Sequence, residues 1–174
     1  MSSNVGGMVE SGEPRWLTPE QTRAWIALAG TTVWLPAALD AQLQRDAGIT
    51  HVEYQVLSWL SMSPGRTARM SDIAARSNVN LSHLSRIAAR LEKRGWMRRT
   101  PDPDDGRATL AVLTHDGWDK VVATAPGHVR EVQRLVFDNS TPAQVRQLQH
   151  IGERIARAAK PDICLPVPGE PAES

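Results

Sequence analysis

The sequence predicts a mainly helical domain with one small β-hairpin, and three observations lead to this prediction. Three Thr-x-x-Glu/Gln sequences mark helix starts, and a short helix, a tight turn and a second amphipathic helix follow one another within residues 71–94. Two short alternating strands flank the turn Asp102-Pro-Asp-Asp-Gly106. The chain has 174 residues, 41% of them hydrophobic and 22% charged, which suits one domain with a real core.

The helix starts are Thr18-Pro-Glu-Gln21, Thr50-His-Val-Glu53 and Thr141-Pro-Ala-Gln144. In this spacing the Thr hydroxyl accepts a hydrogen bond from the third helical amide, while the Glu or Gln side chain reaches back to the cap. We therefore expect long helices near 19–46 and 141–159 and a shorter helix near 51–62. Gly30 and Pro36 predict a kink or break around 32–36 in the first of them.

The remaining elements follow from apolar periodicity and turn residues. Further helices are expected over 71–77, 81–94 and 115–138, and strands over 96–100 and 109–113. Residues 1–14 are rich in Ser, Gly and Glu without an apolar period, and they predict a disordered N-terminal tail. Residues 161–174 contain four prolines and predict an extended Pro-rich C-terminal tail. The domain proper is expected to cover 15–160.

The charge of the chain is segregated. Its 20 Lys and Arg residues against 19 Asp and Glu residues give a net charge of +1, which on its face argues against a nucleic-acid partner. Residues 66–99, however, hold nine basic and two acidic residues and carry +7, so that the rest of the chain carries −6. The basic excess is therefore concentrated in the segment that contains the two short helices.

The second of these helices has two distinct faces. Asn80 is a good N-cap and Gly95 a good stop, and the four residues at i, i+3, i+4 and i+7 make one buried face: Leu84, Ile87, Ala88 and Leu91. The opposite face carries Ser82, His83, Ser85, Arg86, Ala89, Arg90, Lys93 and Arg94. Such a face is often merely solvated, but the second helix of a helix-turn-helix enters the DNA major groove, where arginines bridge guanine edges or phosphates.

The hairpin that follows favours DNA binding over a merely solvated face. Directly after a helix-turn-helix, two strands and a polar turn form a wing. Arg107 lies at the base of this turn, from which it could reach the negative potential of a minor groove. Asp105 is close enough in sequence to hold the Arg107 guanidinium in a bidentate pair. The acidic residues of the turn would otherwise repel phosphate, which is consistent with some of them orienting arginines.

The hairpin motif resembles a known family. Asp105-Gly-Arg107, five residues and then Leu113-Thr114 reproduce the Asp-x-Arg-x5-Leu-Thr wing signature of the MarR (multiple antibiotic resistance regulator) family. Leu91-Glu-Lys-Arg-Gly95 followed by Trp96-Met-Arg-Arg99 is similar to the end of that family's recognition helix and its first wing strand. The resemblance covers about residues 20–160.

The resemblance implies a winged helix-turn-helix at about 50–114 and a helical dimerisation region formed by 19–46, 115–138 and 141–159. It implies a homodimer that binds a pseudo-palindromic double-stranded DNA operator, most often as a repressor. The family's base contacts fall by position on Ser82, His83, Ser85, Arg86 and Arg90. The wing arginine falls on Arg107, with Asp105 as its support. Pro36 and Pro126-Gly127 could bend the dimer arms.

The resemblance also implies a small aromatic or lipophilic effector. Four residues come from helices that would line its cleft: Trp25, Trp34, His51 and Tyr54. Tryptophan at helical spacing is core more often than pocket, so a packing role stays open.

Other classes of protein are disfavoured. The single cysteine, Cys164, forms neither an internal disulfide nor a multi-cysteine zinc site, and the five histidines show no metal-binding spacing, so no cofactor or metal is expected. No nucleophile elbow, phosphate loop or His-Glu-x-x-His motif indicates an enzyme. No signal pattern or long apolar run is evident, so the expected location is the cytoplasm with no membrane partner.

Two alternative functions remain open: a winged-helix module that docks an acidic protein, and a dimer that chiefly binds a small molecule.

Overall fold

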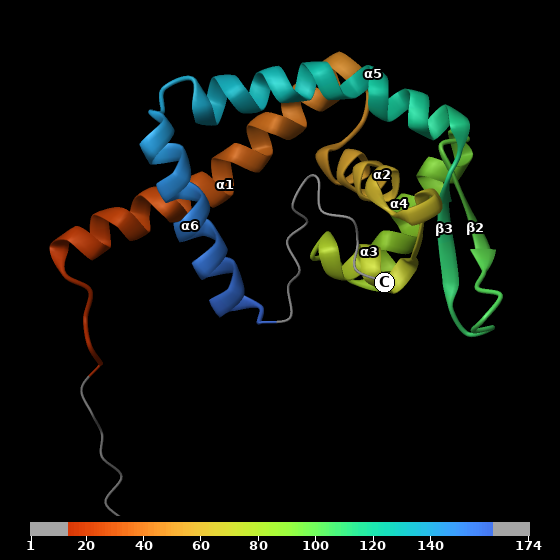
Figure 1. Cartoon of the computed structure of the whole chain (residues 1–174), viewed down its shortest axis with the longest axis horizontal. Helices are drawn as coiled ribbons and strands as arrows, with labels where there is room; N and C mark the ends of the chain where they lie inside the picture. Colours follow the sequence, from red (N-terminus) through yellow and green to blue (C-terminus); the bar gives the residue numbers. More distant parts are fainter. Residues whose placement is uncertain (1–13, 162–174) are drawn as a thin grey trace, which may run out of the picture. The chain divides into compact units, whose positions relative to one another are not determined.

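The structure, a computed structural model, describes residues 14–161 (Figure 1). The elements in chain order are α1 (Pro19–Ala47), α2 (His51–Met62), the one-turn 3-10 helix η1 (Pro64–Arg66), β1 (Thr67–Arg69), α3 (Met70–Arg76), α4 (Leu81–Lys93), β2 (Met97–Pro101), β3 (Thr109–Leu113), α5 (His115–Val132), the π-helical turn η2 (Gln133–Phe137) and α6 (Pro142–Ala159). The predicted fold class, mainly helical with a small winged sheet, is confirmed. Nearly all of both predicted tails, and Cys164, lie outside the described residues.

The chain divides into two compact units between Trp34 and Leu35. The first unit contains the N-terminal half of α1. The second contains the rest of α1 and every later element, including the helix-turn-helix and the wing. The boundary falls within the stretch 32–36, but the helix itself continues through Pro36, so a break there is not found. A proline removes one amide donor from the helix, which the remaining hydrogen bonds of a 29-residue helix tolerate.

The three predicted capping boxes are confirmed. At α2, Thr50 Oγ1 accepts from the amide of Glu53 at 3.2 Å, while Glu53 Oε2 accepts from the amide of Thr50 at 3.1 Å. The same reciprocal pairs join Thr18 to Gln21 and Thr141 to Gln144. Each pair satisfies two backbone donors that a helix start leaves open, so these sequences fix where three helices begin.

The sheet has three antiparallel strands in the order β1-β3-β2, one more than the sequence predicts. β3 is central: Ala111 pairs with Ala68 of β1 on one side and with Arg99 of β2 on the other. β1 has only three residues, too few to show a recognisable alternation of apolar and polar side chains. It nevertheless matters for the site, because it anchors the base of the wing to the segment before α3.

One hydrophobic core holds the second unit together. Its largest completely buried side chains come from α1, α2, α3 and α4 and from the loop before α2: Leu43, Ile49, Val56, Leu57, Leu60, Ile73, Leu84, Ile87 and Leu91. α4 contributes the four residues predicted for its buried face. The opposite face of α4 is therefore fixed outward by packing and not only by its own polarity.

The start of α5 is packed very closely against the entry to the wing. Thr114 caps α5 by accepting from the Gly117 amide at 3.0 Å, and its hydroxyl also donates to the carbonyl of Gly95 at 2.6 Å. A Cβ atom at Gly117 would lie 1.9 Å from the carbonyl oxygen of Trp96, so only glycine fits this position. The Leu113-Thr114 part of the wing motif is thus one buried side chain followed by one helix cap.

α1 is, by length and composition alone, apolar enough to cross a membrane. One such helix near the N-terminus is weak evidence, because a core helix of a protein without a membrane segment passes the same test. The apolar side chains of this helix in the first unit are largely exposed: Trp25, Ile26, Val33 and Trp34. The absence of a membrane partner therefore stays a prediction.

Candidate nucleic-acid interface

α4 presents the predicted recognition face to solvent. Asn80 caps the helix, its side-chain oxygen accepting from the His83 amide at 2.8 Å. Ser82, His83 and Arg86 are exposed and Ser85 is half-buried, so four of the predicted contact residues lie together in the first two turns. Their outward placement follows from burial of the other face.

Arg90 is the fifth predicted contact on α4, and the structure gives it an additional partner. Its Nε donates to Oε1 of Glu53 at 2.8 Å, and the Glu53 side chain is only 3% exposed. Burial raises the pKa of Glu53, but the hydrogen bonds from Arg90 and from the Thr50 amide, with the charges of Arg90 and Arg94, outweigh it and hold the pKa below its usual value. Arg90 therefore ties α4 to α2, a role that sequence spacing does not reveal.

The wing turn is held by its own carboxylates. Oδ1 of Asp105 accepts from the backbone amide of Arg107 at 3.1 Å, and Oδ1 of Asp102 accepts from the amide of Asp104 at 3.0 Å. The backbone pair Asp102–Ala108 closes the loop at 3.1 Å. Arg107 itself is exposed at the base of the turn, where the sequence places it.

Asp105 supports the wing differently from the sequence prediction. The predicted bidentate pair with the Arg107 guanidinium is absent from the ion pairs of residues 14–161. The acidic residues of the turn instead orient Arg69 of β1, whose Nε and Nη2 both lie 2.9 Å from Oδ2 of Asp102 and whose Nη1 lies 4.0 Å from Oδ2 of Asp105. The idea that the acidic residues of the turn orient an arginine is thus correct, but the arginine was misassigned.

Sequence reasoning missed Arg69 because β1 was not predicted. It counted Arg69 only as part of the basic segment. No signal in the sequence pointed to this pair, because the need of Asp102 for a cationic or hydrogen-bonding partner follows from the burial of its side chain, which only the structure reveals.

Two of the four predicted effector residues lie in one polar cluster. His51 and Tyr54 of α2 face His128 of α5, with ring centroids 6.1 Å apart for the two histidines and 4.8 Å for Tyr54 and His128. Trp25 and Trp34 belong to the first unit and are exposed. The structure therefore brings His51 and Tyr54 together and adds His128, which sequence reasoning had not selected.

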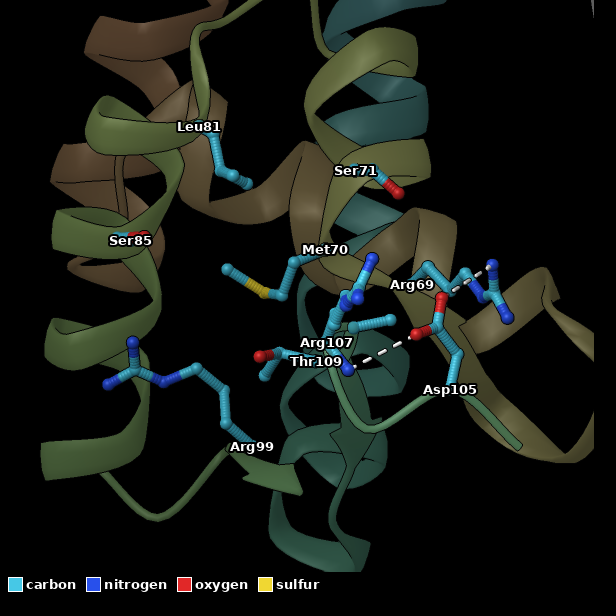
Figure 2. Close-up of a pocket in the computed structure, with 10 residues that line it drawn as sticks. Arg69, Met70, Ser71, Leu81, Ser85, Arg99, Asp105, Arg107 and Thr109 are labelled. Carbon is cyan, nitrogen blue, oxygen red and sulfur yellow. Dashed lines mark hydrogen bonds and ion pairs between the residues drawn. The ribbon is translucent and has the colours of Figure 1, made fainter. Parts of the chain in front are cut away.

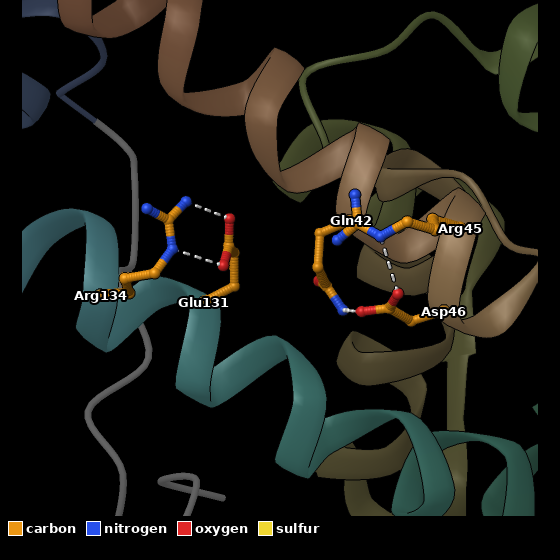
Figure 3. Close-up of polar contacts among 5 residues, drawn as sticks. All are labelled: Gln42, Arg45, Asp46, Glu131 and Arg134. Carbon is orange, nitrogen blue, oxygen red and sulfur yellow. Dashed lines mark hydrogen bonds and ion pairs between the residues drawn. The ribbon is translucent and has the colours of Figure 1, made fainter.

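Both histidines of this cluster have a buried Nδ1 atom that lacks a hydrogen-bond partner among the described residues. Oε1 of Gln42 on α1 is also buried without such a partner. Gln42 donates through Nε2 to Asp46 at 3.0 Å, and Figure 3 shows this pair on α1 beside the Glu131–Arg134 ion pair of the α5–η2 segment.

Burial lowers the pKa of His51, although the charge of Asp40 opposes the effect. Burial and the neighbouring His51 lower the pKa of His128. In the described range, no group of three or more His, Cys, Asp or Glu side chains is arranged to hold a metal ion.

A capped recognition helix with an outward basic face, followed by a three-stranded sheet with an exposed arginine at its tip, defines a winged helix-turn-helix DNA-binding protein. The MarR family model matches residues 49–109, which cover α2 to the start of β3. The HTH-type transcriptional regulator YdcH of Bacillus subtilis (strain 168) is 32% identical over 110 residues, covering 62% of this chain and 74% of YdcH.

Solved structures show the same relationship. Sco3205, a MarR family transcriptional regulator from Streptomyces coelicolor solved in complex with DNA, matches with a TM-score of 0.82 and 43% identity over 86% of this chain and 94% of its own. AbsC, another MarR family regulator from the same organism, matches with a TM-score of 0.79 and 32% identity over 86% of this chain and 100% of its own. The chain belongs to the MarR family and is a DNA-binding transcriptional regulator; its relatives are regulators and not enzymes.

Proposed function

We propose that the protein is a homodimeric repressor that reads a pseudo-palindromic operator through the first two turns of α4. The observation that carries this proposal is the division of α4: Leu84, Ile87 and Ala88 are completely buried, while Ser82, His83 and Arg86 face outward. Small hydroxyl side chains near the helix N-terminus permit close approach to base edges, and Arg86 can bind guanine O6 and N7 in a bidentate manner. Ser85 completes this surface.

Two further arginines complete the proposed DNA contacts. Arg107 is exposed at the wing, from which it would enter the adjacent minor groove. The contact from Arg90 to Glu53 uses Nε, so the two Nη groups keep four N–H donors for a base or a phosphate. Arg90 would thus contribute to DNA binding in a fixed orientation, with Glu53 as the residue that sets it.

Dimerisation is supported by apolar side chains that a single chain leaves uncovered. α6 exposes Leu148, Ile151 and Ile155 at i, i+3 and i+7, so that one stripe of the helix lacks a partner. α5 exposes Val122 and Val129, and the N-terminal half of α1 exposes two tryptophans. We assign these helices to the dimerisation region of a domain covering 15–160, and a second copy of the chain would cover them.

The effector would bind beside the His51–Tyr54–His128 cluster. This cluster joins α2 and α5 and offers aromatic surface together with unsatisfied polar atoms, which suits a small aromatic or lipophilic compound with one polar group. A ligand releases DNA only if it binds the DNA-incompetent arrangement more tightly. Trp25 and Trp34, which belong to the first unit, stay separate candidates for effector contact. We propose the cytoplasm as the location of the protein.

Selection of bound fragments from genomic DNA tests the proposal, because it yields operator sequence, symmetry and half-site spacing together. Fluorescence anisotropy on the selected operator should show that Arg86→Ala weakens binding by about 1–3 kcal/mol and relaxes the preference at one base pair. Recovery of no DNA, together with capture of an acidic protein, would instead favour a protein-docking module. Repression is tested by transcription from a promoter that contains the operator.

A further inference from the structure

The C-terminal end of α1 is capped by two cations from other elements. A helix leaves its last carbonyl groups without intrahelical partners, and these groups form the negative end of its dipole. Nζ of Lys120 on α5 donates to the carbonyl of Ala47, the last residue of α1, at 2.6 Å. Nη1 of Arg94, which follows α4 as its cap, donates to the carbonyl of Gly48 at 2.9 Å. The end of α1 is therefore tied to α4 and to α5 at one place.

Trp96 contacts both cations. Its ring centroid lies 4.9 Å from the guanidinium carbon of Arg94 and 5.1 Å from Nζ of Lys120, and both distances are within the range of a cation–π contact. The backbone carbonyl of Trp96 accepts from the amide of Thr114, the residue that caps α5. We call Arg94, Trp96 and Lys120 the Trp96 junction. It connects the end of α4, the entry to the wing and the first turns of α5.

The Trp96 junction brings two like charges close together. Burial lowers the pKa of Lys120, and the neighbouring charge of Arg94 lowers it further. Neither cation lies within 4.0 Å of a carboxylate oxygen in residues 14–161. The carbonyl and ring contacts therefore offset a repulsion between the two cations, and removal of either side chain would loosen the attachment of α1.

The Trp96 junction lies between the two parts of the chain that the proposed function uses. Arg94 follows the C-terminal end of α4, whereas Ser82 and Arg86 lie in its first two turns. Lys120 belongs to α5, whose exposed valines we assign to the dimerisation region. Contacts at this place fix the angle between the reading helix and α5. In a symmetric dimer, that angle determines the distance between the two reading helices.

We propose that Arg94 and Lys120 are positioning residues that set the half-site spacing of the operator, by holding α4 against α5 and the end of α1. The inference rests on the proposed homodimer that reads a pseudo-palindrome. Neither residue has to touch DNA in this role. With a loosened junction, each reading helix would still dock on its own half-site, but the dimer would no longer be preorganised for one separation of the half-sites.

The first test uses operators whose spacer between half-sites is native, one base pair shorter or one base pair longer. Arg94→Met and Lys120→Met should each lose about tenfold in affinity for the native spacer, the effect of one charge-assisted hydrogen bond, and should lose less on the other two. Lys93→Met removes the same charge from the exposed position next to Arg94 and should keep the wild-type preference. An unchanged spacer preference in both junction variants, or an equal change in Lys93→Met, would overturn the proposal.

A duplex with a single half-site separates positioning from direct DNA contact. Only one reading helix can bind it, so Arg94→Met and Lys120→Met should bind it no more weakly than Lys93→Met does, which also shows that they fold. Arg107→Gln is the contrasting variant. Figure 2 shows Arg107 at the wing, where its backbone amide donates to Asp105, and loss of this proposed DNA contact should weaken binding to the half-site and to the full operator. Half-site losses in the junction variants as large as that of Arg107→Gln would refute the positioning role.

A conservative variant tests whether the contact with α1 is what matters. Lys120→Arg keeps a charged donor for the carbonyl of Ala47 and should retain the preference for the native spacer. A Lys120→Arg variant that loses this preference as fully as Lys120→Met would refute the proposal. A protein that selects no operator, or that sediments as a monomer, would refute the proposed function instead.

Discussion

The guanidinium of Arg90 on the recognition helix donates to the carboxylate of Glu53 on α2 across 2.8 Å. Glu53 at the same time completes the capping box of α2 by accepting from the Thr50 amide. One buried carboxylate therefore sets both the start of α2 and the attachment of α4 to it. α4 is therefore coupled through this contact to the first turn of α2, which also carries His51.

Arg90→Met should destabilise the protein more than removal of an ordinary surface charge. The substitution keeps much of the side-chain packing but leaves the Glu53 carboxylate buried without its cation. Because the Arg90 side chain is about half exposed, we expect a loss of about 1–2 kcal/mol and not the larger penalty of a fully buried pair. Urea unfolding at fixed protein concentration measures it. Arg86→Met, on the exposed face of α4, is the control, and equal losses would contradict the structural role of Arg90.

Stability should fall when the pH drops below about 6.5, because both histidines of the cluster have a folded-state pKa below the unfolded value. The unfolded chain then binds more protons than the folded chain, so the free energy of unfolding decreases from pH 7.5 to 5.5. His128→Gln removes one of the two groups and should flatten this dependence in urea titrations. His150→Gln, on the exposed surface of α6, is the matched control substitution. An unchanged slope in His128→Gln would refute the assignment.

Gly117→Ala should be strongly destabilising, since the added Cβ would meet the Trp96 carbonyl oxygen at 1.9 Å and a Leu113 methyl carbon at 2.8 Å. Relief requires α5 to move away from the wing, and we expect a loss of about 2–3 kcal/mol. Gly152→Ala is the matched control, because nothing lies within 4 Å of its Cβ position on α6. It should gain about 0.5–1 kcal/mol through helix propensity. Thermal unfolding of both variants gives the comparison, and a neutral Gly117→Ala would show that this packing is looser than described.

Local rules explain which parts of the fold the sequence could predict. The capping threonines and the apolar spacing of α4 are short-range signals, so the helix starts and the outward face of the recognition helix follow from neighbouring residues. The partners of Asp102 and Glu53 are 33 and 37 residues away along the chain. Nothing in the spacing of the wing turn indicates Arg69 as a partner, since that pairing depends on how β1 adds to the sheet. Sequence reasoning therefore assigned Asp105 to the nearest arginine.

The apolar stripe of α6 allows the proposed dimer to be tested directly. Ile151 lies in the middle of the stripe and is more than half exposed in the single chain. Burial of each such aliphatic side chain in an interface contributes about 1.5–3 kcal/mol, and a carboxylate at its centre would add a desolvation penalty. Ile151→Asp should therefore shift the monomer–dimer equilibrium by at least about 100-fold toward the monomer. Sedimentation equilibrium measures the shift, and circular dichroism checks that the helices persist.

Gln147→Asp, which adds the same charge at another exposed position of α6, should stay dimeric. A wild-type protein that sediments as a monomer, or an Ile151→Asp variant as dimeric as the control, would exclude this stripe as the interface.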